Sequence, residues 1–409
     1  MIDILCKNAK NAKTKLAKLN SSIKKEVLNS CADEILANID GLLKANLKDI
    51  NDNSNLKSAF VDRLRLNENR INNMINTLRN VALLDDVVGR VVFGKTLENG
   101  LKMQQIKVPL GVVAIIFESR PNVCVDAFAL CFKSSNVVIL RGGKEALNTN
   151  LFLVSIFQKV LKRFDLDENF VQIVSDTNRD LVKELLRAND YIDVVIPRGS
   201  ASLINEIKNN SLIPCIQTGV GNCHIYVDYN AKIDDAINII NNAKTQRPGV
   251  CNSVETLLIN KNIASEILPL LESKMPNVEL RVCAKCEKFL KNYKKANDSD
   301  WEEEFEDLIL AIKIVDDINE AILHIQKYST NHSEAIISQD YTNINKFLDE
   351  IDSAVLYVNA STRFSDGAEF GYAAEIGIST QKLHARGPMG LNELTTTKYQ
   401  IIGNAHIRK

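Results

Sequence analysis

The sequence predicts an α/β fold built on parallel sheets. Short apolar runs, typical of strands buried on both faces, alternate with amphipathic helical stretches from residue 111 onward. The composition, with 45% hydrophobic and 25% charged residues, is that of a folded globular protein. The length of 409 residues predicts two or three domains, which leaves room for a sizeable core.

Charge and hydropathy exclude several classes of protein. The chain carries 50 basic and 51 acidic residues, so it has no overall attraction to nucleic acid or to an anionic membrane. The most apolar uncharged run, 108–117, is too short to cross a bilayer. The N-terminus lacks the apolar core and cleavage site of a signal peptide. We therefore expect a cytoplasmic protein with neither a nucleic-acid nor a membrane partner.

The first eighty residues are expected to be helical. Apolar residues recur at three- and four-residue steps from Val27 to Leu42, and 61–81 repeats the pattern. Ser21 and Ser22 are the expected N-caps of the first of these helices.

The pattern changes at Gly89. Residues 90–93 and 101–108 alternate in polarity around the turn-rich segment 94–100, which predicts a hairpin. A free strand pair would expose an edge, so we expect it to pair with another subunit of a homo-oligomer.

Two α/β series follow. In the first, strands are expected at 111–117, 137–140, 171–174, 194–197 and 213–216, and helices at 123–133, 146–164, 179–188 and 200–209. In the second, strands are expected at 225–227, 255–259, 278–282, 308–315, 335–337 and 355–358, and helices at 233–245, 263–274, 319–328 and 342–350. The charge-dense segment 285–306 is interpreted as a solvated insertion, and 359–390 as a long, functional loop.

Cys251 is the candidate nucleophile. A helix is expected to end near Thr245, and Pro248 and Gly249 prevent its continuation, so Cys251 lies on a tight turn before a strand. A cysteine there can attack an acyl carbon while neighbouring backbone N–H groups receive the oxyanion. The alternative is a small apolar residue that only fills the turn.

The remaining cysteines and the histidines predict no metal site. Nine scattered cysteines, an odd number, indicate free thiols. Cys283 and Cys286 form the only C-x-x-C, and no second Cys or His pair lies nearby to complete a zinc site. We interpret the pair as a chance pairing on a surface segment. The five histidines show no ligand spacing.

Several expected strands are followed by glycine-rich or polar turns. Arg141 and Lys144 flank two glycines at a strand end, an arrangement that suits phosphate, although a solvated turn fits equally well. Gly199 and Ser200 open a helix whose N–H groups offer a second phosphate cradle or a simple cap. The G-x-G-x-x-G dinucleotide fingerprint is absent.

Several motifs occur along the chain in a fixed order. They are Glu118-Ser-Arg-Pro-Asn-Val, Gln217-Thr-Gly-Val-Gly-Asn, Arg247-Pro-Gly-Val-Cys-Asn, and the runs at 315–336, 357–364 and 379–391. Together they resemble γ-glutamyl phosphate reductase (glutamate-5-semialdehyde dehydrogenase), the proline-biosynthesis member of the aldehyde dehydrogenase superfamily. The resemblance covers nearly the whole chain.

The resemblance implies an aldehyde dehydrogenase-like fold and an NADPH-dependent oxidoreductase. Members of this family reduce L-glutamyl 5-phosphate to L-glutamate 5-semialdehyde and phosphate. Cys251 would attack the acyl phosphate and form a thioester that hydride then reduces. The Cys251 backbone N–H and a side chain near Ser119 or Asn122 would bind the oxyanion, because oxidising relatives carry an Asn after the equivalent strand.

Gln217 marks a departure from the oxidising relatives. They carry a Glu where Gln217 aligns, and that Glu activates the water that hydrolyses the thioester. A neutral amide cannot act as a general base, so the resemblance implies a thioester protected from water. The alternative is a residue that only packs or forms hydrogen bonds.

The resemblance also implies cofactor and substrate contacts. The expected cofactor-binding residues are Arg141, Lys144, Gly199, Ser200, Gly219 and Glu304, and the alignment of Glu304 can slip to Glu303. Two basic groups near the adenosine ribose would favour the 2′-phosphate, hence NADPH. The expected anion-binding arginines are Arg120, Arg363 and Arg386, with Asn359 at the amino-acid end; for each arginine the alternative is an ordinary surface residue. The lability of the acyl phosphate raises the hypothesis of contact with glutamate 5-kinase.

The predicted organisation has three parts. A Rossmann-type, NADP-binding domain comprises residues 1–90 and 108–222, a catalytic α/β domain comprises 223–390, and a small β oligomerisation element comprises 91–107 and 391–409. Two other functions stay open: a CoA-acylating aldehyde dehydrogenase, which would require CoA and be independent of phosphate, and a non-catalytic metabolite-binding protein. The intact Cys251 turn argues against the latter.

Overall fold

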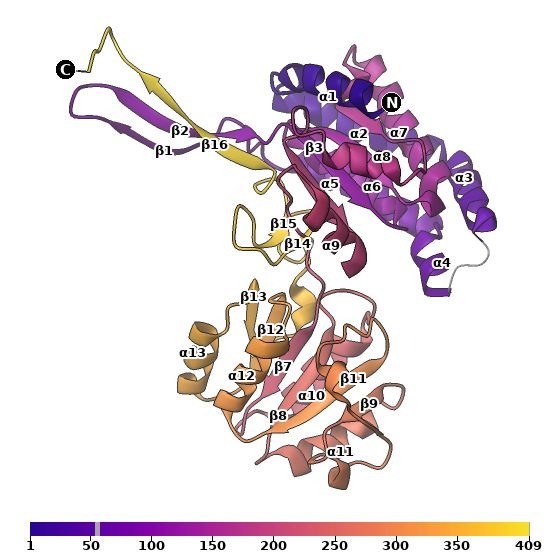
Figure 1. The fold of residues 1–409 in the computed structure, drawn as a ribbon, viewed down its shortest axis with the longest axis vertical. Coiled ribbons are helices and arrows are strands. Elements are labelled where there is room, and N and C mark those ends of the chain that lie inside the picture. Colours follow the sequence, from indigo (N-terminus) through magenta and orange to yellow (C-terminus); the bar gives the residue numbers. More distant parts are fainter. Residues whose placement is uncertain (54–57, 409) are drawn as a thin grey trace. The chain divides into compact units, whose positions relative to one another are not determined.

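The computed structural model describes residues 1–53 and 58–408, and the chain divides into two compact units (Figure 1). Unit 1 consists of Met1–Thr218, Gly371–Gly377 and Met389–Lys409, and unit 2 consists of Gly219–Phe370 and Ile378–Pro388. The first boundary falls at Thr218, four residues before the predicted one, and the predicted oligomerisation element falls within unit 1. No helix in the described ranges is both long and apolar enough to cross a lipid bilayer.

The first part of unit 1 is helical, as predicted. The helices are α1 (Ile2–Leu16), α2 (Ser21–Ala37), α3 (Ile39–Asp52), α4 (Ser58–Leu64) and α5 (Glu68–Leu83). Two expectations were wrong. The N-cap of α2 is Asn20, whose side chain accepts the Ile23 N–H, and neither Ser21 nor Ser22 has that role. The stretch 61–81 is two helices, because the Asn67 side chain accepts the Arg70 N–H and begins a new one.

The core of unit 1 is a four-stranded parallel sheet. Its strand order is β5 (Val171–Ile173), β4 (Val137–Gly142), β3 (Val112–Phe117) and β6 (Val194–Arg198). All residues of β3 and β4 are buried, as the continuous apolar runs predict. The connecting helices are α6 (Pro121–Lys133), α7 (Leu147–Arg163), α8 (Asp180–Leu186) and α9 (Ala201–Asn210). The parallel sheet with crossover helices is confirmed.

The strand expected at 213–216 does not form. The chain there makes a single bridge to β6, between Val195 and Cys215. Val195 N–H donates to the Pro214 carbonyl, and Ile216 N–H donates to the Val195 carbonyl. Pro214 has no N–H to continue a ladder, so the apolar run stays irregular.

The hairpin forms as predicted and gains a third strand. β1 (Val91–Thr96) pairs antiparallel with β2 (Lys102–Pro109), and β16 (Thr395–Ile402) pairs with the other edge of β2 (Figure 1). Apolar side chains on both outer strands are exposed, among them Phe93 on β1 and Ile401 on β16. Such side chains on an exposed edge are typical of a contact surface.

Unit 2 is built on a seven-stranded parallel sheet. Its order is β10 (Lys294–Lys295), β9 (Glu279–Val282), β11 (Ile309–Val315), β8 (Val254–Asn260), β7 (Cys223–Val227), β12 (Ser333–Ile337) and β13 (Val355–Val358). Its helices are α10 (Ile233–Thr245), α11 (Ala264–Lys274), α12 (Ile318–Tyr328) and α13 (Tyr341–Glu350).

The two faces of this sheet carry separate apolar clusters. Ile225 and Val227 of β7 pack in one cluster with residues of α10 and α11, whereas Tyr226, between them, packs with residues of α12 and α13. This alternation follows from the two-residue period of a strand. Helices therefore cover both faces, as the second α/β series predicts.

The interpretation of 285–306 as a solvated insertion was wrong in part. This segment supplies β10, which extends the sheet beyond β9, and it buries Cys286, Leu290 and Trp301. Charged residues surround these apolar residues in the sequence, so the composition of the segment does not reveal that part of it is buried. The long segment after β13 contains β14 (Gly377–Ser379) and β15 (Gly387–Met389), which pair with each other.

Candidate active site

Cys251 lies on a turn between the end of α10 and the start of β8, as the sequence predicts. The Ser253 N–H donates to the Val250 carbonyl at 2.9 Å and closes this turn. Cys251 itself is half-buried, so the residue keeps access to solvent. The turn therefore presents a thiol at the amino end of a buried strand.

Asn252 anchors the turn on one side. Its buried Nδ2 donates to the Ser365 carbonyl at 2.7 Å and to the Arg363 carbonyl at 3.4 Å. In return, the Thr362 hydroxyl donates to the Asn252 carbonyl at 2.6 Å. Three hydrogen bonds thus attach the residue after the thiol to the segment 362–365, which holds the backbone at Cys251 in place.

Gly221 and Cys223 anchor the turn on its other side. A Cβ on Gly221 would overlap the carbonyl of Cys251, so only glycine allows this approach. The Cys223 thiol donates to the same carbonyl, with Sγ 3.2 Å from the oxygen. The Cys251 carbonyl is therefore held from the side of β7.

Glu304 lies next to this contact. Its Oε1 accepts the Gly221 N–H at 2.9 Å, whereas the neighbouring Glu303 is exposed. The carboxylate that the resemblance assigns to the cofactor ribose is thus attached, through Gly221, to the turn that carries Cys251.

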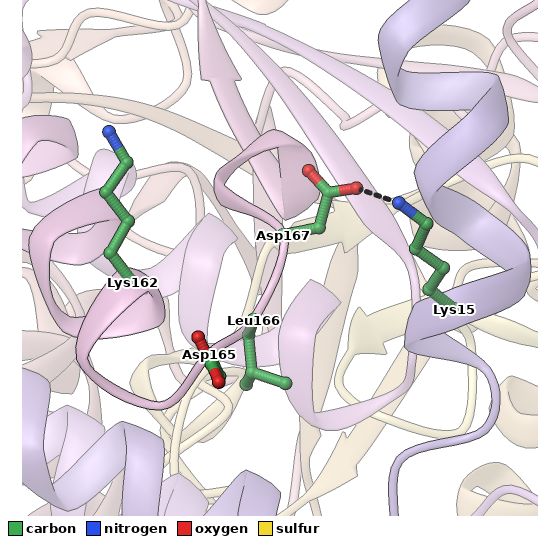
Figure 2. Close-up of a pocket in the computed structure, with 5 residues that line it drawn as sticks. All are labelled: Lys15, Lys162, Asp165, Leu166 and Asp167. Atoms are coloured by element: carbon green, nitrogen blue, oxygen red, sulfur yellow. Dashed lines mark hydrogen bonds and ion pairs between the residues drawn. The ribbon is translucent and has the colours of Figure 1, made fainter.

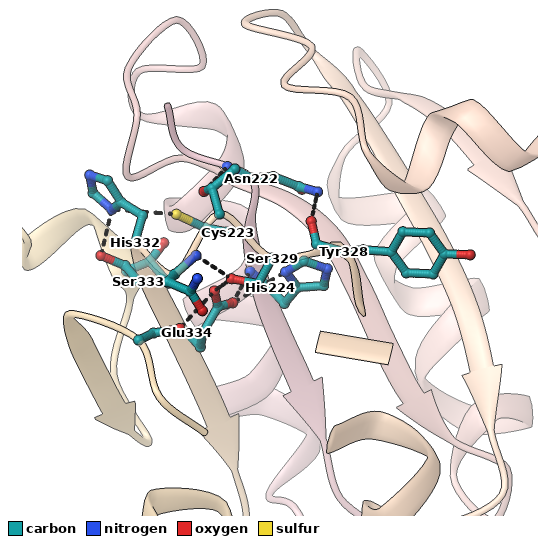
Figure 3. A network of polar contacts seen from close by, with 12 residues as sticks. Asn222, Cys223, His224, Tyr328, Ser329, His332, Ser333 and Glu334 are labelled. Atoms are coloured by element: carbon teal, nitrogen blue, oxygen red, sulfur yellow. Dashed lines mark hydrogen bonds and ion pairs between the residues drawn. The ribbon is translucent and has the colours of Figure 1, made fainter. Parts of the chain in front are cut away.

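A buried carboxylate holds the start of β7 (Figure 3). Oε2 of Glu334, on β12, accepts the His224 N–H at 2.6 Å, and Oε1 accepts the Ser329 hydroxyl. The side chains of Glu334 and His224 are both fully buried. Asn222 adds two bonds from its Nδ2, to the carbonyls of Trp301 (2.7 Å) and Tyr328 (3.0 Å). Residues 222–224, which include the Cys223 donor, are fixed in this way.

His332 connects the two anchors of the turn. Its Nδ1 lies 2.8 Å from the Ser333 hydroxyl and 3.8 Å from Cys223 Sγ (Figure 3). The Ser333 hydroxyl lies 2.7 Å from that of Ser365, whose carbonyl accepts the Asn252 amide. A continuous polar chain therefore runs from the Cys223 side of the turn to the Asn252 side.

A fully buried ion pair lies behind the turn. Lys244 Nζ, at the end of α10, is 2.6 Å from Glu255 Oε2 on β8. Burial raises the pKa of Glu255 to about 8, against the opposing effect of Lys244, and the charge of Glu304 adds to the rise. Burial also lowers the pKa of Lys244. The pair joins α10 to β8 on either side of Cys251.

Ser119 and Asn122 lie in unit 1, where β3 ends and α6 begins. Ser119 has a φ of 40°, a strained backbone for a residue other than glycine, and it is buried. Its N–H and its hydroxyl both donate to Glu145 Oε1, at 2.8 and 2.6 Å. Asn122 is exposed, and its Nδ2 donates to Asp126 in the same helix. An amide Nδ2 has a second N–H, so Asn122 can also donate to a ligand.

Arg141 and Lys144 lie at the neighbouring strand end in different environments. Arg141 is buried, and its terminal nitrogens donate to the carbonyls of Gly142 and Thr177. Its pKa is lowered, chiefly by burial. Lys144 is exposed. Of the two, Lys144 is the cation that an anion can reach.

Gly199 and Ser200 open α9 after β6, as predicted. The Ser200 hydroxyl caps the helix by accepting the Leu203 N–H. The carboxylate of Glu118 accepts the Ser200 N–H at 2.7 Å and leaves no space for a Cβ on Gly199. Because β3, β4 and β6 are adjacent and parallel, Ser119, Lys144 and Ser200 lie at one edge of the sheet.

Arg363 is a predicted anion-binding arginine that interacts electrostatically with Cys251. It is half-buried, and its Nε donates to Gln246 Oε1 at 2.8 Å. Burial lowers its pKa most, and the charges of Asp366 and Cys251 oppose this. Arg363 and Cys251 therefore interact electrostatically, and such a cation stabilises negative charge on the sulfur.

The other predicted anion binders have different neighbours. Arg386 forms an ion pair with Asp352 at 2.7 Å, and Arg120 is the half-buried N-cap residue of α6. The Asn359 Nδ2 donates to the Ser338 carbonyl at 2.9 Å, and the Asn359 Oδ1 accepts the Ser338 N–H at 3.0 Å. The amide of Asn359 thus holds the end of β13.

Gln217 and Gly219 lie on either side of the boundary between the units. Gln217 is a half-buried residue of unit 1. Gly219, in unit 2, donates its N–H to the Ile378 carbonyl at 2.7 Å, and a Cβ there would collide with Thr380. Gly219 therefore permits a close backbone approach of 378–380.

The sequence did not reveal several residues that shape these sites. They are Glu145, Cys223, Lys244 and Glu255; Glu118 belongs to a motif that the sequence singles out, but its contact with Ser200 was not expected. Each acts through a partner that is remote in sequence or on another element, and a carboxylate or a thiol in a short strand or turn has no distinctive local pattern. The run at 332–334 was noticed, but only through the resemblance.

Two shallow surface depressions lie apart from these residues. One is lined by Lys15, Lys162, Asp165, Leu166 and Asp167, with Lys15 and Asp167 paired at 2.7 Å (Figure 2). The other is lined by residues of α10 and α11. In residues 1–53 and 58–408, no three His, Cys, Asp or Glu side chains are grouped as metal ligands.

Comparisons with known proteins agree on one family. A profile of the aldehyde dehydrogenase family matches residues 1–285. Gamma-glutamyl phosphate reductase of Thermoanaerobacter pseudethanolicus is 49% identical over the full length of both chains. The enzyme of that name from Clostridium kluyveri is 50% identical over 98% of this chain and 97% of its own.

Solved structures show the same likeness. The crystal structure of gamma-glutamyl phosphate reductase from Thermotoga maritima matches with a TM-score of 0.96 and 43% identity, and all of both chains is covered. An acetylating aldehyde dehydrogenase from Geobacillus thermoglucosidasius matches with a TM-score of 0.74 at 16% identity, over 100% of this chain and 97% of that one. The second likeness concerns the fold alone.

Proposed function

The chain belongs to the aldehyde dehydrogenase family, and we propose that it is an NADPH-dependent reductase that converts L-glutamyl 5-phosphate to L-glutamate 5-semialdehyde and phosphate. The observation that carries this proposal is the Cys251 turn. Gly221, Cys223 and Asn252 hold its backbone, and Arg363 interacts with its charge. The relatives that match over the full length bear the name of this enzyme.

The first step requires a thiolate and an anionic leaving group. The sulfur of Cys251 attacks the carbonyl carbon of the acyl phosphate, the bond from that carbon to the phosphate oxygen breaks, and a thioester remains on Cys251. Arg363 favours the charged sulfur through its electrostatic interaction with Cys251. Fixing the turn keeps the sulfur in position and reduces the entropy lost in reaching the transition state.

The negative charge on the carbonyl oxygen needs hydrogen-bond donors. The backbone N–H of Cys251 is one, because its turn is anchored through Ser253 and Asn252. By the family resemblance, the second donor is a side chain near Ser119 or Asn122. The free N–H of the Asn122 amide fits that role.

The unit 1 sheet edge has the chemistry that a phosphorylated dinucleotide needs. Two cations, Arg141 and Lys144, flank glycines at the end of β4, and Nε of Arg141 has no hydrogen-bond partner among the described atoms. Gly199 and Ser200 lie at the N-terminus of α9, where the N–H of the N-cap residue Ser200 binds the Glu118 carboxylate, so this end of the helix accepts negative charge. When bound, NADPH supplies the hydride that reduces the thioester.

The proposed cofactor contacts follow from this arrangement. Lys144 binds the 2′-phosphate, Gly199 and Ser200 lie near the pyrophosphate, and Glu304 holds the nicotinamide ribose. Gly219 has no side chain, so it allows the backbone to approach the cofactor closely. Glu304 is preferred over Glu303 because it is half-buried and its carboxylate accepts the Gly221 N–H.

The substrate contacts are a separate part of the proposal. Arg363, with Arg120 and Arg386, binds the anionic groups of the substrate, and Asn359 binds its amino-acid end.

Replacing Lys144 with alanine is expected to weaken NADPH binding about tenfold to hundredfold and to leave NADH binding nearly unchanged, because a charge-assisted hydrogen bond to the 2′-phosphate is lost. Arg141→Ala should change the binding of NADPH and NADH by more similar factors, since the Arg141 guanidinium already donates hydrogen bonds to two carbonyls. Nucleotide titration by fluorescence measures both constants. Lys183→Ala, an exposed lysine on α8, is the matched control. Equal losses for NADPH and NADH would move the 2′-phosphate site elsewhere.

Replacing Gln217 with glutamate is expected to create phosphate-independent oxidation of the semialdehyde. A carboxylate can take a proton from water, so it opens a hydrolytic route from the thioester that an amide does not. The measurement is NADP reduction without phosphate, followed in the variant and the parent chain. If the variant still requires phosphate, Gln217 only packs or forms hydrogen bonds.

The reverse reaction tests the function itself. Purified protein should reduce NADP in the presence of glutamate 5-semialdehyde and inorganic phosphate, and much less without phosphate. A requirement for CoA in place of phosphate would support the CoA-acylating alternative, for which the likeness extends only to the fold at 16% identity. Inactivity under both conditions would favour a non-catalytic protein.

We also propose a homo-oligomer assembled through the β1–β2–β16 sheet. Its outer strands expose Val91, Val92, Phe93, Ile401 and Ile402. An apolar sheet edge of this kind favours strand pairing or packing with a second copy.

Contact with glutamate 5-kinase is a hypothesis that rests on the lability of the acyl phosphate, and co-purification of the two proteins at micromolar concentration tests it. We expect the enzyme to act in the cytoplasm.

A further inference from the structure

The C-x-x-C pair of unit 2 has a geometry that the proposed reduction does not use. Cys283 follows the last residue of β9 and continues its ladder, with its N–H donating to the Ile312 carbonyl at 3.0 Å. The Cys286 N–H donates to the Cys283 carbonyl at 2.9 Å and closes a turn. The sulfurs of the two residues are 3.6 Å apart. The pair is thus a compact dithiol beside β11.

The two thiols differ in access. Cys283 is half-exposed, whereas Cys286 is completely buried. The Cys283 sulfur accepts the Ile314 N–H at 3.5 Å, and the Cys286 thiol points to the Ile312 carbonyl at 3.8 Å. An accessible sulfur that accepts N–H groups, backed by a buried second thiol, has the arrangement of an attacking and a resolving cysteine.

The charge state separates Cys283 from the other thiols. A side-chain hydrogen bond with Cys286 and the backbone N–H groups of Ile314, Lys285 and Cys286 lower the pKa of Cys283 to about 6, although burial opposes this. Burial instead raises the pKa of the thiols of Cys6, Cys31, Cys124, Cys131, Cys215 and Cys223. The backbone N–H groups around its sulfur therefore favour the thiolate of Cys283, whereas burial disfavours the thiolate of these six cysteines.

We propose that Cys283 and Cys286 form a thiol–disulfide exchange site that reacts with low-molecular-weight disulfides and closes reversibly into an intramolecular disulfide. The turn between them meets the main geometric condition. A turn with this hydrogen bond keeps its end Cα atoms within about 7 Å, and a disulfide needs about 4.4–6.8 Å. Side-chain rotation can then bring the sulfurs from contact to bonding distance.

The exchange proceeds in two balanced steps. The Cys283 thiolate attacks one sulfur of the external disulfide, whose S–S bond breaks, and one thiolate leaves. Cys286 then loses its proton and attacks the Cys283 sulfur of this mixed disulfide, and the second external thiolate leaves. Two protein thiols are oxidised, one external disulfide is reduced to two thiols, and an added dithiol reverses the reaction.

A zinc site is a weaker account of the same pair. Structural zinc takes four ligands, and the described residues offer no third His, Cys, Asp or Glu beside the two sulfurs. Nearby charges are already paired with each other, Lys285 with Asp316 and Lys295 with Glu287.

Oxidised glutathione is the probe for the test, applied to the full chain. Peptide mapping by mass spectrometry should find Cys283 and Cys286 joined in the parent protein, and glutathione trapped on Cys283 in Cys286→Ser. Cys283→Ser should leave Cys286 unmodified. Glutathione that persists on Cys283 of the parent chain, or a Cys286→Ser protein that takes up none there, would overturn the proposal.

Alkylation of the parent chain gives a second measurement that needs no variant. With iodoacetamide near neutral pH, Cys283 should react at least about tenfold faster than Cys215, even allowing for the lower nucleophilicity of a more acidic thiol. Cys215 is the matched control because it is also half-exposed, whereas burial raises its pKa to about 11. Equal rates at the two cysteines would contradict the assignment.

Discussion

Replacing Cys251 with serine is expected to reduce turnover of L-glutamyl 5-phosphate by at least about 10⁴-fold, because a hydroxyl at neutral pH is a far weaker nucleophile than a thiolate and no thioester can form. Binding of NADPH should stay within a few-fold, since the proposed cofactor contacts do not involve the sulfur. Steady-state rates and a fluorescence titration of NADPH measure the two effects separately.

A matched control is available in the same chain. Cys215→Ser changes a half-exposed thiol in unit 1 that has no proposed role, and it should leave turnover unchanged. Substantial residual activity in Cys251→Ser would refute the covalent route. A parallel loss of NADPH binding would instead show that the serine disturbs the turn held by Gly221 and Asn252.

Replacing Lys244 with methionine is expected to destabilise unit 2 by roughly 3–5 kcal/mol, because buried Glu255 loses the cation paired with it and must hold a proton that the unfolded chain releases. The side chains of Lys244 and Glu255 are fully buried and 2.6 Å apart. The fluorescence of Trp301, the single tryptophan of the chain, reports the unfolding of unit 2 in urea.

Two further variants distinguish the loss of the buried charge pair from a loss of side-chain packing. Lys244→Met combined with Glu255→Leu should regain most of the lost stability, since no charge is then left buried. Lys261→Met removes an exposed partner of Asp316 and should cost less than about 1 kcal/mol. A double variant as unstable as the single one would show that lost packing, not an unpaired charge, is the cause.

The pH dependence of Lys244→Met has a defined sign. Burial raises the pKa of Glu255 from 4.5 to about 8 even with the lysine present, and removing Lys244 removes an effect that lowers it. Between 4.5 and the raised value, the folded variant holds a proton that the unfolded chain releases. The variant's stability is therefore fully present at low pH and is lost as pH rises through the raised value. Because the parent shows the same loss up to about pH 8, the deficit should stay nearly constant below that pH and grow above it.

Much of the fold followed from local patterns. The continuous apolar runs of β3 and β4 predicted buried parallel strands, and Pro248 with Gly249 predicted the turn before β8. These features depend on the neighbouring residues alone, because strand burial and helix termination are decided over a few positions. The errors arose where one residue changed the outcome, as when Pro214 prevented a ladder.

The site was predicted less completely. The motif around Cys251 predicts the nucleophile, but nothing local distinguishes Cys223, whose thiol reaches the Cys251 carbonyl across 28 positions of sequence. Glu145 is a similar case, since its carboxylate binds Ser119 at the end of a neighbouring strand, and for Glu118 the motif was visible but the bond to Ser200 was not. Cys283 and Cys286 show the converse, because the spacing was visible but their unequal burial was not.

By itself the sequence determined most of the alternation of strands and helices, the candidate for the reactive thiol and the family to which the chain belongs. Only the tertiary structure decided which groups hold that thiol, which of Arg141 and Lys144 is exposed to an anion, and that Lys244 and Glu255 share one buried site. The physical reason is range. Hydrophobic periodicity acts within an element, whereas burial, charge pairing and hydrogen bonding depend on segments that meet only after the sheets have formed.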